Sequence, residues 1–350
     1  MADTTTLRQV LTQKKPPVRC YVEPGPNTAA PAPNPETNKT WPTPTITIWD
    51  EFSLANLNES YGHILDRPTP AACLPCPQAN QELSGLSIEV EHDVRKLIGW
   101  NNALMGPALQ LAASRLELYT GRGLYYSHST AEKNKSNNAS LLDQFRSSQV
   151  DHVIGLDDFP VHHFVVGFGR SSSKWIGRAL AAQRDNPTMN LLLPVRQLAN
   201  ICRAAKTRYG YVQTDKEVVV CCFSRDDSDR WKAAIMPIPW SRHGPEVLTT
   251  DLALWWLCML AMSSPDNRAI VAEGDMVKIN EWAIVHLGEG RGWARRHRYS
   301  NLEVSTDSPA PSVPLPGNHA LPQSHDTAGS KNKRSSTDEL DVNVKRQRKL

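Results

Sequence analysis

The sequence predicts an α/β protein in which a single mixed-sheet domain, flanked by helices, lies between disordered N- and C-terminal arms. Segments with helical and strand-like spacing alternate between residues 46 and 304, in the order helix, two strands, helix, two or three strands, helix. Residues 1–45 are rich in proline, and residues 305–350 are polar and lack apolar periodicity. Neither arm can bury enough apolar surface to fold, whereas residues 46–304 are long enough for one core.

The first part of the domain carries helical spacing in two segments. Residues 46–65 predict a short helical piece, and residues 84–118 predict a longer helix that Pro107 is expected to kink or split. Between them lies a loop with the only CxxC of the chain, Cys73-Leu74-Pro75-Cys76. No second cysteine pair or nearby histidine completes a zinc site, so no metal is predicted there.

The middle of the chain alternates between strands and helices. The segments 149–156 (QVDHVIGL) and 162–167 (HHFVVG) predict two strands joined by a turn at residues 157–160. A helix with a proline in its first turn is expected next, then a hairpin, a further strand, a helix capped by Thr249 or Thr250, and a short element. These elements are assigned to residues 191–206, 209–213 with 218–223, 233–238, 250–262 and 275–282.

Composition argues against several classes of protein. The formal net charge of +3 is too small to indicate nucleic-acid binding by itself. No apolar run reaches the ~18 residues of a membrane span, and residues 252–262 predict a buried helix instead. The N-terminus has no apolar signal-peptide region, so secretion is not expected. The seven cysteines are scattered, as is usual in a reducing compartment.

The C-terminal arm ends in two basic clusters separated by residues 335–344, which is the form of a bipartite nuclear-import signal. The sequence therefore predicts a nuclear protein that binds a nuclear-import receptor. Basic runs also bind nucleic acid without specificity, and this alternative stays open. The residues of the predicted signal are Lys331, Lys333, Arg334, Lys345, Arg346, Arg348 and Lys349.

Three segments carry a resemblance to a known family: 150–154 (VDHVI), 165–170 (VVGFGR) with Ser173-Lys174-Trp175, and 194–197 (PVRQ) continuing to 207–215 (TRYGYVQTD). With the later ALWWL at 253–257, they resemble the restriction-endonuclease-like core of the PD-(D/E)XK superfamily. More narrowly, they are similar to a group of fungal nuclear proteins built on that core. The resemblance covers roughly residues 85–285 and implies a restriction-endonuclease-like fold.

The resemblance also implies a site, and the sequence departs from the family pattern there. An active member holds Mg²⁺ on an aspartate at the end of one strand and on an acid of the next, and a lysine two positions later positions the attacking water. Asp151 matches the first aspartate, with help from Glu89 or Glu91. The second position reads Phe168-Gly169-Arg170. Phenylalanine cannot ligate a metal, and arginine cannot serve as a base.

The resemblance therefore implies a catalytically degenerate nuclease that needs no cofactor, with Mg²⁺ expected only if the nuclease is active. The remnant site residues are Asp151, Glu89, Arg170 in place of the lysine, and Gln197. A basic surface is expected beside them, with a tryptophan that could stack on a base. A normally charged helix face with a tryptophan at the core edge is the alternative. The residues of this surface are Arg170, Lys174, Trp175, Arg178 and Arg196, with Arg203 nearby.

Three functions are compatible with the sequence. The first is a degenerate nuclease-like protein that binds nucleic acid or chromatin in the nucleus in a regulatory role. The second is an active metal-dependent DNA nuclease whose second acid comes from another position. The third is a protein-interaction or regulatory module in which the fold is only a scaffold. Nothing in the sequence predicts an oligomeric state.

Overall fold

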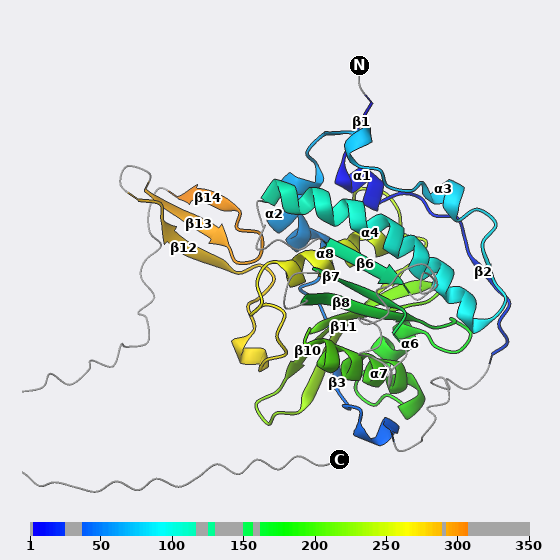
Figure 1. Ribbon diagram of the computed structural model, residues 1–350. Coiled ribbons are helices and arrows are strands. Elements are labelled where there is room, and N and C mark those ends of the chain that lie inside the picture. The colour runs from blue at the N-terminus through cyan, green and yellow to red at the C-terminus, as the bar shows by residue number, and fades with distance from the viewer. Residues whose placement is uncertain are drawn as a thin grey trace, which may run out of the picture. The chain divides into compact units, whose positions relative to one another are not determined.

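A mixed sheet of seven strands forms the centre of the protein, in the spatial order β3-β11-β10-β9-β8-β7-β6 (Figure 1). The computed structural model describes residues 3–24, 37–116, 125–129, 150–156, 162–288 and 292–306. The pairs β8–β9 and β3–β11 are parallel, and the other neighbouring pairs are antiparallel. The strands are β3 (Thr45–Ile48), β6 (Tyr125–Ser129), β7 (His152–Leu156), β8 (His162–Gly169), β9 (Tyr209–Gln213), β10 (Glu217–Arg225) and β11 (Trp231–Pro239). The mixed α/β class is confirmed.

Helices cover both faces of this sheet, so the domain has three layers. Successive side chains of β10 alternate between the two faces: Val218 and Val220 belong to one hydrophobic cluster, and Val219 and Cys221 to the other. The first cluster contains α1 (Leu7–Leu11), α2 (Leu54–Leu65), α4 (Arg95–Leu116) and α8 (Thr250–Met262), and the second contains α6 (Gly177–Ala182) and α7 (Met189–Ala205).

Helix α8 is buried along its whole length, as all thirteen of its residues are inaccessible to solvent. It contacts strands β8 and β10 on one side and helices α1 and α4 on the other. Trp256 stacks on Phe52 with 4.1 Å between ring centroids, and Trp255 meets Tyr61 edge-on at 5.8 Å. The helix predicted at 250–262 is confirmed, with Thr249 as its cap.

The expectation of a disordered N-terminal arm at residues 1–45 is wrong for residues 3–24 and 37–45. Helix α1 begins with a capping box between Thr6 and Gln9 and buries Leu7, Val10 and Leu11. The hydroxyl of Thr249 at the start of α8 donates to the Leu11 carbonyl at 2.6 Å. The high proline content of residues 1–45 predicted disorder, although it does not extend into this short apolar helix. The apolar side chains of α1 are buried because they pack against α8.

A buried ion pair fixes the next part of the N-terminal segment. The Nζ atom of Lys15 lies 2.7 Å from Oδ1 of Asp251 and 3.9 Å from the ring centroid of Trp240. Burial lowers the pKa of Lys15, and the charge of Asp251 opposes that shift. The Trp240 indole N–H also donates to the Pro16 carbonyl at 3.1 Å. The start of the chain is therefore bound to the base of α8.

Several helices and strands begin or end at other residues than predicted. Residues 45–48 form β3 rather than the start of a helix, because they pair in parallel with β11 at the edge of the sheet. Helix α4 begins only at Arg95 and continues through Pro107 without being split. The hairpin, the strand at 233–238 and the helix at 191–206 are confirmed as β9–β10, β11 and α7. The predicted turn at 157–160 lies outside the described residues.

Short elements complete the body of the domain. Two small sheets pair β1 with β4 and β2 with β5. None of the helices in the described ranges combines the length and apolar character that a membrane span requires. These elements are β1 (Thr4–Thr5), β2 (Arg19–Cys20), η1 (Thr37–Thr40), β4 (Thr69–Pro70), η2 (Ala71–Cys73), α3 (Ala79–Glu82), β5 (Ser87–Ile88), η3 (Glu91–Val94) and η5 (Glu273–Asp275).

A separate three-stranded antiparallel sheet follows, comprising β12 (Trp282–His286), β13 (Trp293–His297) and β14 (Glu303–Thr306). Figure 1 shows it extending away from the main sheet. The sequence predicted only a short element at 275–282 here. Residues up to Asp307 form one compact unit. Residues 305 and 306, which were predicted to start the disordered tail, belong to β14, so that boundary is wrong. The rest of the predicted tail, residues 307–350, lies outside the described residues.

We expect Leu11→Ala to lower the free energy of unfolding by about 2–5 kcal/mol, because a fully buried leucine is truncated against α8. Deletion of residues 1–24 is expected to abolish cooperative unfolding. Urea denaturation followed by circular dichroism measures both effects. The control is Lys14→Ala, an exposed side chain in the same segment, with an expected change within about 0.5 kcal/mol. Equal stabilities of Leu11→Ala and Lys14→Ala would contradict the docked arrangement.

Candidate functional site

The ends of β7 and β8 meet the start of α4 in a small pocket of about 150 Å³. Asp151 lies immediately before β7, and its N–H donates to the carbonyl of Gly167 on β8 at 3.0 Å. Gly169, at the end of β8, permits close approach of η3, since a Cβ there would lie 2.8 Å from Cγ1 of Val94. The lining residues are Glu91, His92, Val94, Arg95, Asp151, Gly169 and Arg170.

Both carboxylate oxygens of Asp151 are engaged by groups of the chain itself. Oδ1 forms an ion pair with Nε of Arg95 at 2.7 Å. Oδ2 accepts the backbone N–H of Gly169 at 2.9 Å. Asp151 is almost fully buried, so its charge depends on these partners. Arg95 therefore supplies the positive charge that faces Asp151.

Arg170 follows β8 directly and is buried, with 2% of its surface exposed. Its Nη2 donates to Oε1 of Gln197 on α7 at 2.7 Å, and Nη1 donates to the Gly169 carbonyl at 3.2 Å. Burial lowers the pKa of the guanidinium, while the charges of Glu91 and Asp151 oppose that shift. Arg170, which lines the pocket, is therefore held in place by its hydrogen bond to Gln197.

Glu91, not Glu89, is the second acid of the site. Its Oε2 accepts Nζ of Lys174 at 2.7 Å, and its Oε1 lies 3.9 Å from Nη1 of Arg170. Glu89 is exposed, does not line the pocket, and accepts the Ser87 hydroxyl at 2.7 Å. The assignment of Glu89 as a remnant of the site is therefore wrong, because the chain there forms β5 and η3 rather than a helix.

The residues present do not fit a Mg²⁺ ion. Phe168 is fully buried in the hydrophobic cluster beneath α7, so the second ligand position of the family pattern supplies no oxygen. Asp151 and Glu91 each form an ion pair with a cationic side chain. Within the described ranges, no group of three or more His, Cys, Asp or Glu side chains could hold a metal. Mg²⁺ requires oxygen ligands in octahedral geometry, and here it would have to displace Arg95.

The predicted basic surface is not formed as a continuous face. Trp175 is buried and its indole N–H donates to the Leu191 carbonyl at 2.9 Å, so the prediction that it stacks on a base is wrong. Arg196 is buried and donates to the carbonyls of Trp41 and Pro42. Trp175 lies inward because it packs in the hydrophobic cluster beneath α6 and α7, and Arg196 is covered by residues 41–42, whose carbonyls it binds.

Only part of that set remains near solvent. Arg178 is half exposed and forms an ion pair with the buried Glu217 at 2.9 Å. Lys174 is held at the pocket by Glu91. Arg203 donates to the side chain of Asn200 at 2.6 Å. The structure therefore brings Lys174 and Arg170 together around Glu91. Arg178 and Arg196 bind other partners, Glu217 and the carbonyls of Trp41 and Pro42.

Sequence reasoning missed Arg95, the residue on which the charge balance of the pocket depends. Arg95 and Asp151 are 56 residues apart in the chain, and no local pattern connects them. Searches against family models, characterised proteins and solved structures found no match for the chain. The interpretation of the pocket therefore depends on its geometry: it holds two carboxylates, and each of them is paired with a cationic side chain of the chain itself.

We expect Arg95→Met to lower the free energy of unfolding by about 3 kcal/mol or more, because it leaves the Asp151 charge buried without its cation. The double variant Arg95→Met/Asp151→Asn is expected to regain part of that loss, since the amide oxygen can still accept the Gly169 N–H. Thermal and urea denaturation measure both.

Lys96→Met is the matched control for this change. It removes a neighbouring cation whose side chain is half exposed and pairs with Asp93 at 2.9 Å, so its expected cost is below about 1 kcal/mol. The assignment of Arg95 as the counter-charge of Asp151 fails if Arg95→Met and Lys96→Met are equally stable.

Proposed function

We propose that this chain is a non-catalytic, nuclease-like protein that binds nucleic acid in the nucleus in a regulatory role. The observation that carries the proposal is the ion pair of Asp151 with Arg95 at 2.7 Å, at the position where a PD-(D/E)XK nuclease would hold Mg²⁺. In this proposal the core is restriction-endonuclease-like. The support is that β7 and β8 pair antiparallel, so Asp151 lies beside Phe168-Gly169-Arg170 as the resemblance expects.

A guanidinium group can replace the charge of a metal ion but not its chemistry. It balances Asp151 electrostatically, yet it offers no open coordination position for water and no Lewis acidity. Arg170 takes the place of the family lysine, but an arginine remains protonated near neutral pH and cannot accept a proton from water. In this proposal the Arg95–Asp151 ion pair stabilises the fold, and the pocket lacks the groups that would activate a nucleophile.

Nucleic acid is the partner that the charge distribution favours. The basic clusters of the C-terminal arm can contact phosphates without sequence readout, and such contacts do not require a catalytic site. The same clusters have the form of an import signal, so the nucleus is the compartment that the proposal assigns. An active nuclease and an interaction module without nucleic-acid binding are the competing functions.

We expect the wild-type protein to cleave plasmid DNA no faster than Asp151→Ala with either Mg²⁺ or Mn²⁺, because Phe168 and Arg95 leave no metal site. DNA binding by the same preparation is expected to weaken steeply with rising salt. Agarose gels measure cleavage, and fluorescence anisotropy measures binding. Wild-type cleavage that Asp151→Ala abolishes would establish the active nuclease instead. Absence of both activities would favour the interaction module.

We expect nuclear accumulation to depend on the C-terminal arm. Truncation after Ser330, or substitution of the four basic residues from Lys345 to Lys349 by alanine, is expected to leave a fluorescent fusion in the cytoplasm. Microscopy of a fusion too large to diffuse through nuclear pores measures the distribution. Substitution of Arg225 and Arg230, two basic residues of the folded domain, is the control. Unchanged nuclear signal after truncation would refute this assignment.

A further inference from the structure

The three-stranded sheet β12–β14 presents two tryptophans and an arginine on one face. The register pairs Ile284 with Arg295 and His286 with Trp293, and it pairs Arg295 in turn with Val304. Directly paired residues share a face and alternate residues on a strand share a face. We define the tryptophan face as Trp282, Ile284, His286, Trp293, Arg295 and Val304. The register also places Thr306 and His297 on this face. His297 pairs with Trp282 and is fully buried, so the face is covered at its Trp282 end.

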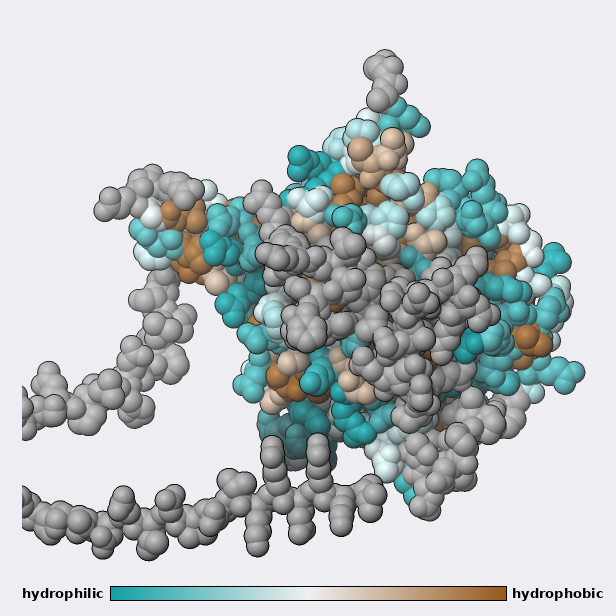
Figure 2. Space-filling model, viewed as in Figure 1, coloured by the Kyte–Doolittle hydropathy of each residue, from teal (hydrophilic) through white to brown (hydrophobic). Residues whose placement is uncertain are grey.

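The tryptophan face is turned to solvent. Ile284, Trp293 and Val304 are 45%, 39% and 40% exposed, and the other large hydrophobic residues of the described ranges with comparable exposure are scattered over separate elements. Figure 2 shows hydrophobic residues at the surface of the projecting sheet. The opposite face bears Ala283, Val285 and Arg296, which line a cavity of about 350 Å³ together with Ser264, Asp266 and Asn267 of the body. That face is therefore partly covered by the body, although Arg296 and Glu303 on it remain exposed.

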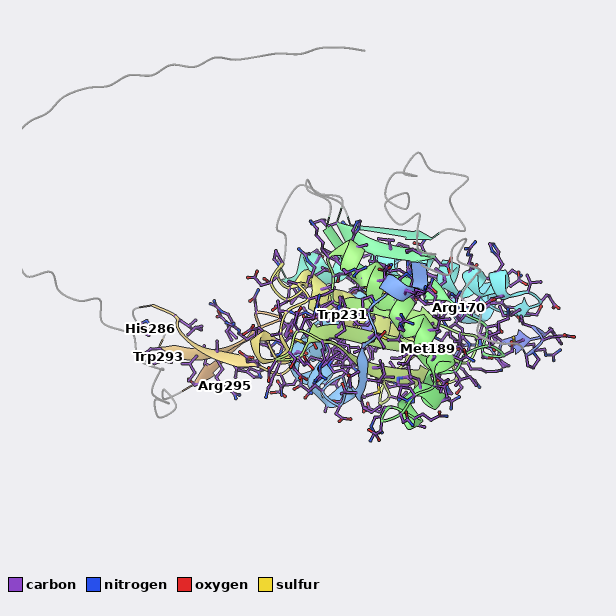
Figure 3. The ribbon with its side chains drawn as sticks, turned by 90° about the horizontal axis from the view of Figure 1, so that it is seen from below. Arg170, Met189, Trp231, His286, Trp293 and Arg295 are labelled. Atoms are coloured by element: carbon purple, nitrogen blue, oxygen red, sulfur yellow. The ribbon has the colours of Figure 1, made fainter. Side chains whose placement is uncertain are left out.

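Aromatic and cationic groups are interleaved on the tryptophan face. The guanidinium of Arg295 lies 5.2 Å from the ring centroid of Trp282, and the rings of His286 and Trp293 are 4.8 Å apart. Arg295 has no carboxylate partner among the described residues. Figure 3 shows Trp293, His286 and Arg295 together at the far end of the molecule from Arg170.

The carboxylates of this region belong to other cations. Glu303 lies on the opposite face and pairs with Arg296, whose Nε donates to Oε1 at 2.9 Å. Glu281 precedes β12 and lies 3.7 Å from Arg298. The charge of the tryptophan face is therefore positive. Among the described residues, no acidic side chain on this face would repel an anionic ligand.

Single-stranded nucleic acid matches this combination of groups better than other partners do. Unpaired bases present π-faces that stack on exposed tryptophan rings, and their phosphates are attracted to arginine. A duplex keeps its bases stacked on one another and offers only phosphates to such a surface. The chain continues from β14 directly into residues 307–350, whose basic clusters add further attraction for a polyanion.

We propose that the tryptophan face is a binding surface for single-stranded nucleic acid, in which bases stack on the exposed Trp293 and Arg295, held against the ring of Trp282, contacts the backbone. The proposal rests on the proposed function in that it assigns nucleic-acid binding to a particular surface. That surface lies away from the pocket of Asp151, so binding here needs neither a metal nor the remnant site.

The test is fluorescence anisotropy of the full-length protein with a labelled oligothymidylate and with a duplex of the same length. Lys345, Arg346, Arg348 and Lys349 are changed to alanine in the parent and in all variants to reduce binding by the tail, and one reference sample keeps the tail intact. We expect tighter binding of the single strand, and a loss of about five- to one-hundred-fold in affinity for Trp293→Ala. Trp293→Phe is expected to retain most of the affinity, since a ring remains. Arg295→Ala is expected to reduce the salt dependence by about one phosphate contact.

Two control variants separate this surface from general effects of charge and exposure. Arg296→Ala removes the same charge from the same strand but on the opposite face. Tyr21→Ala removes an aromatic ring that is 56% exposed elsewhere. Both are expected to bind as the parent does. Melting curves confirm that each variant is folded, and Arg295→Lys provides a conservative second variant.

The binding measurements decide between three outcomes. Selective loss in Trp293→Ala and Arg295→Ala supports the proposal. Binding that is unchanged in these variants, equally reduced by Arg295→Ala and Arg296→Ala, or stronger for the duplex, overturns the tryptophan face while leaving the proposed function standing. Absence of binding to either oligonucleotide, including by the protein with its tail intact, overturns both.

Discussion

The burial of α8 on every side is the constraint on which the rest of the structure depends. A helix that is apolar around its whole circumference needs a sheet on one side and other helices on the remaining sides. Strands β8 and β10 supply the first, and α1 and α4 supply contacts on the other side. The Lys15–Asp251 pair then closes its N-terminal end. This is why a proline-rich N-terminal segment belongs to the domain.

The same packing determines the chemistry of the candidate site. Helix α4 lies against α8, and this position brings its first residue, Arg95, to the carboxylate of Asp151. In the proposed function, this arginine contributes a fixed charge where an active nuclease of the resembled family would hold an exchangeable metal ion. A cation of this kind stabilises a buried carboxylate but offers no coordination position for water. The site and the core are thus parts of one arrangement.

The two ends of the domain differ in how their polar and aromatic groups are used. Around Asp151, cations and carboxylates are paired with one another, and their side chains are no more than 27% exposed. On the β12–β14 sheet, Arg295 and Trp293 face outward, and the neighbouring carboxylates are held by other arginines. Charged groups that are paired within the protein are not available to a ligand, whereas an exposed arginine without a carboxylate partner and an exposed tryptophan ring are. This difference is the physical basis for assigning structural work to the pocket and recognition to the sheet.

The sequence by itself determined the elements whose patterns are local. The runs of β-branched and aromatic residues in β7, β9 and β10 indicate strands buried on both faces, as they are. The apolar run of α8 and the amphipathic spacing of α7 likewise indicate burial, and the antiparallel pairing of β7 with β8 places Asp151 beside Phe168-Gly169-Arg170. Only the tertiary structure decided that α1 docks on α8, that Trp175 and Arg196 face inward, that Arg95 neutralises Asp151, and that β12–β14 forms an outward face. Periodicity records which residues of one element share a face, but the partner of a charge and the cover of a helix come from segments distant in the chain, and packing alone brings them together.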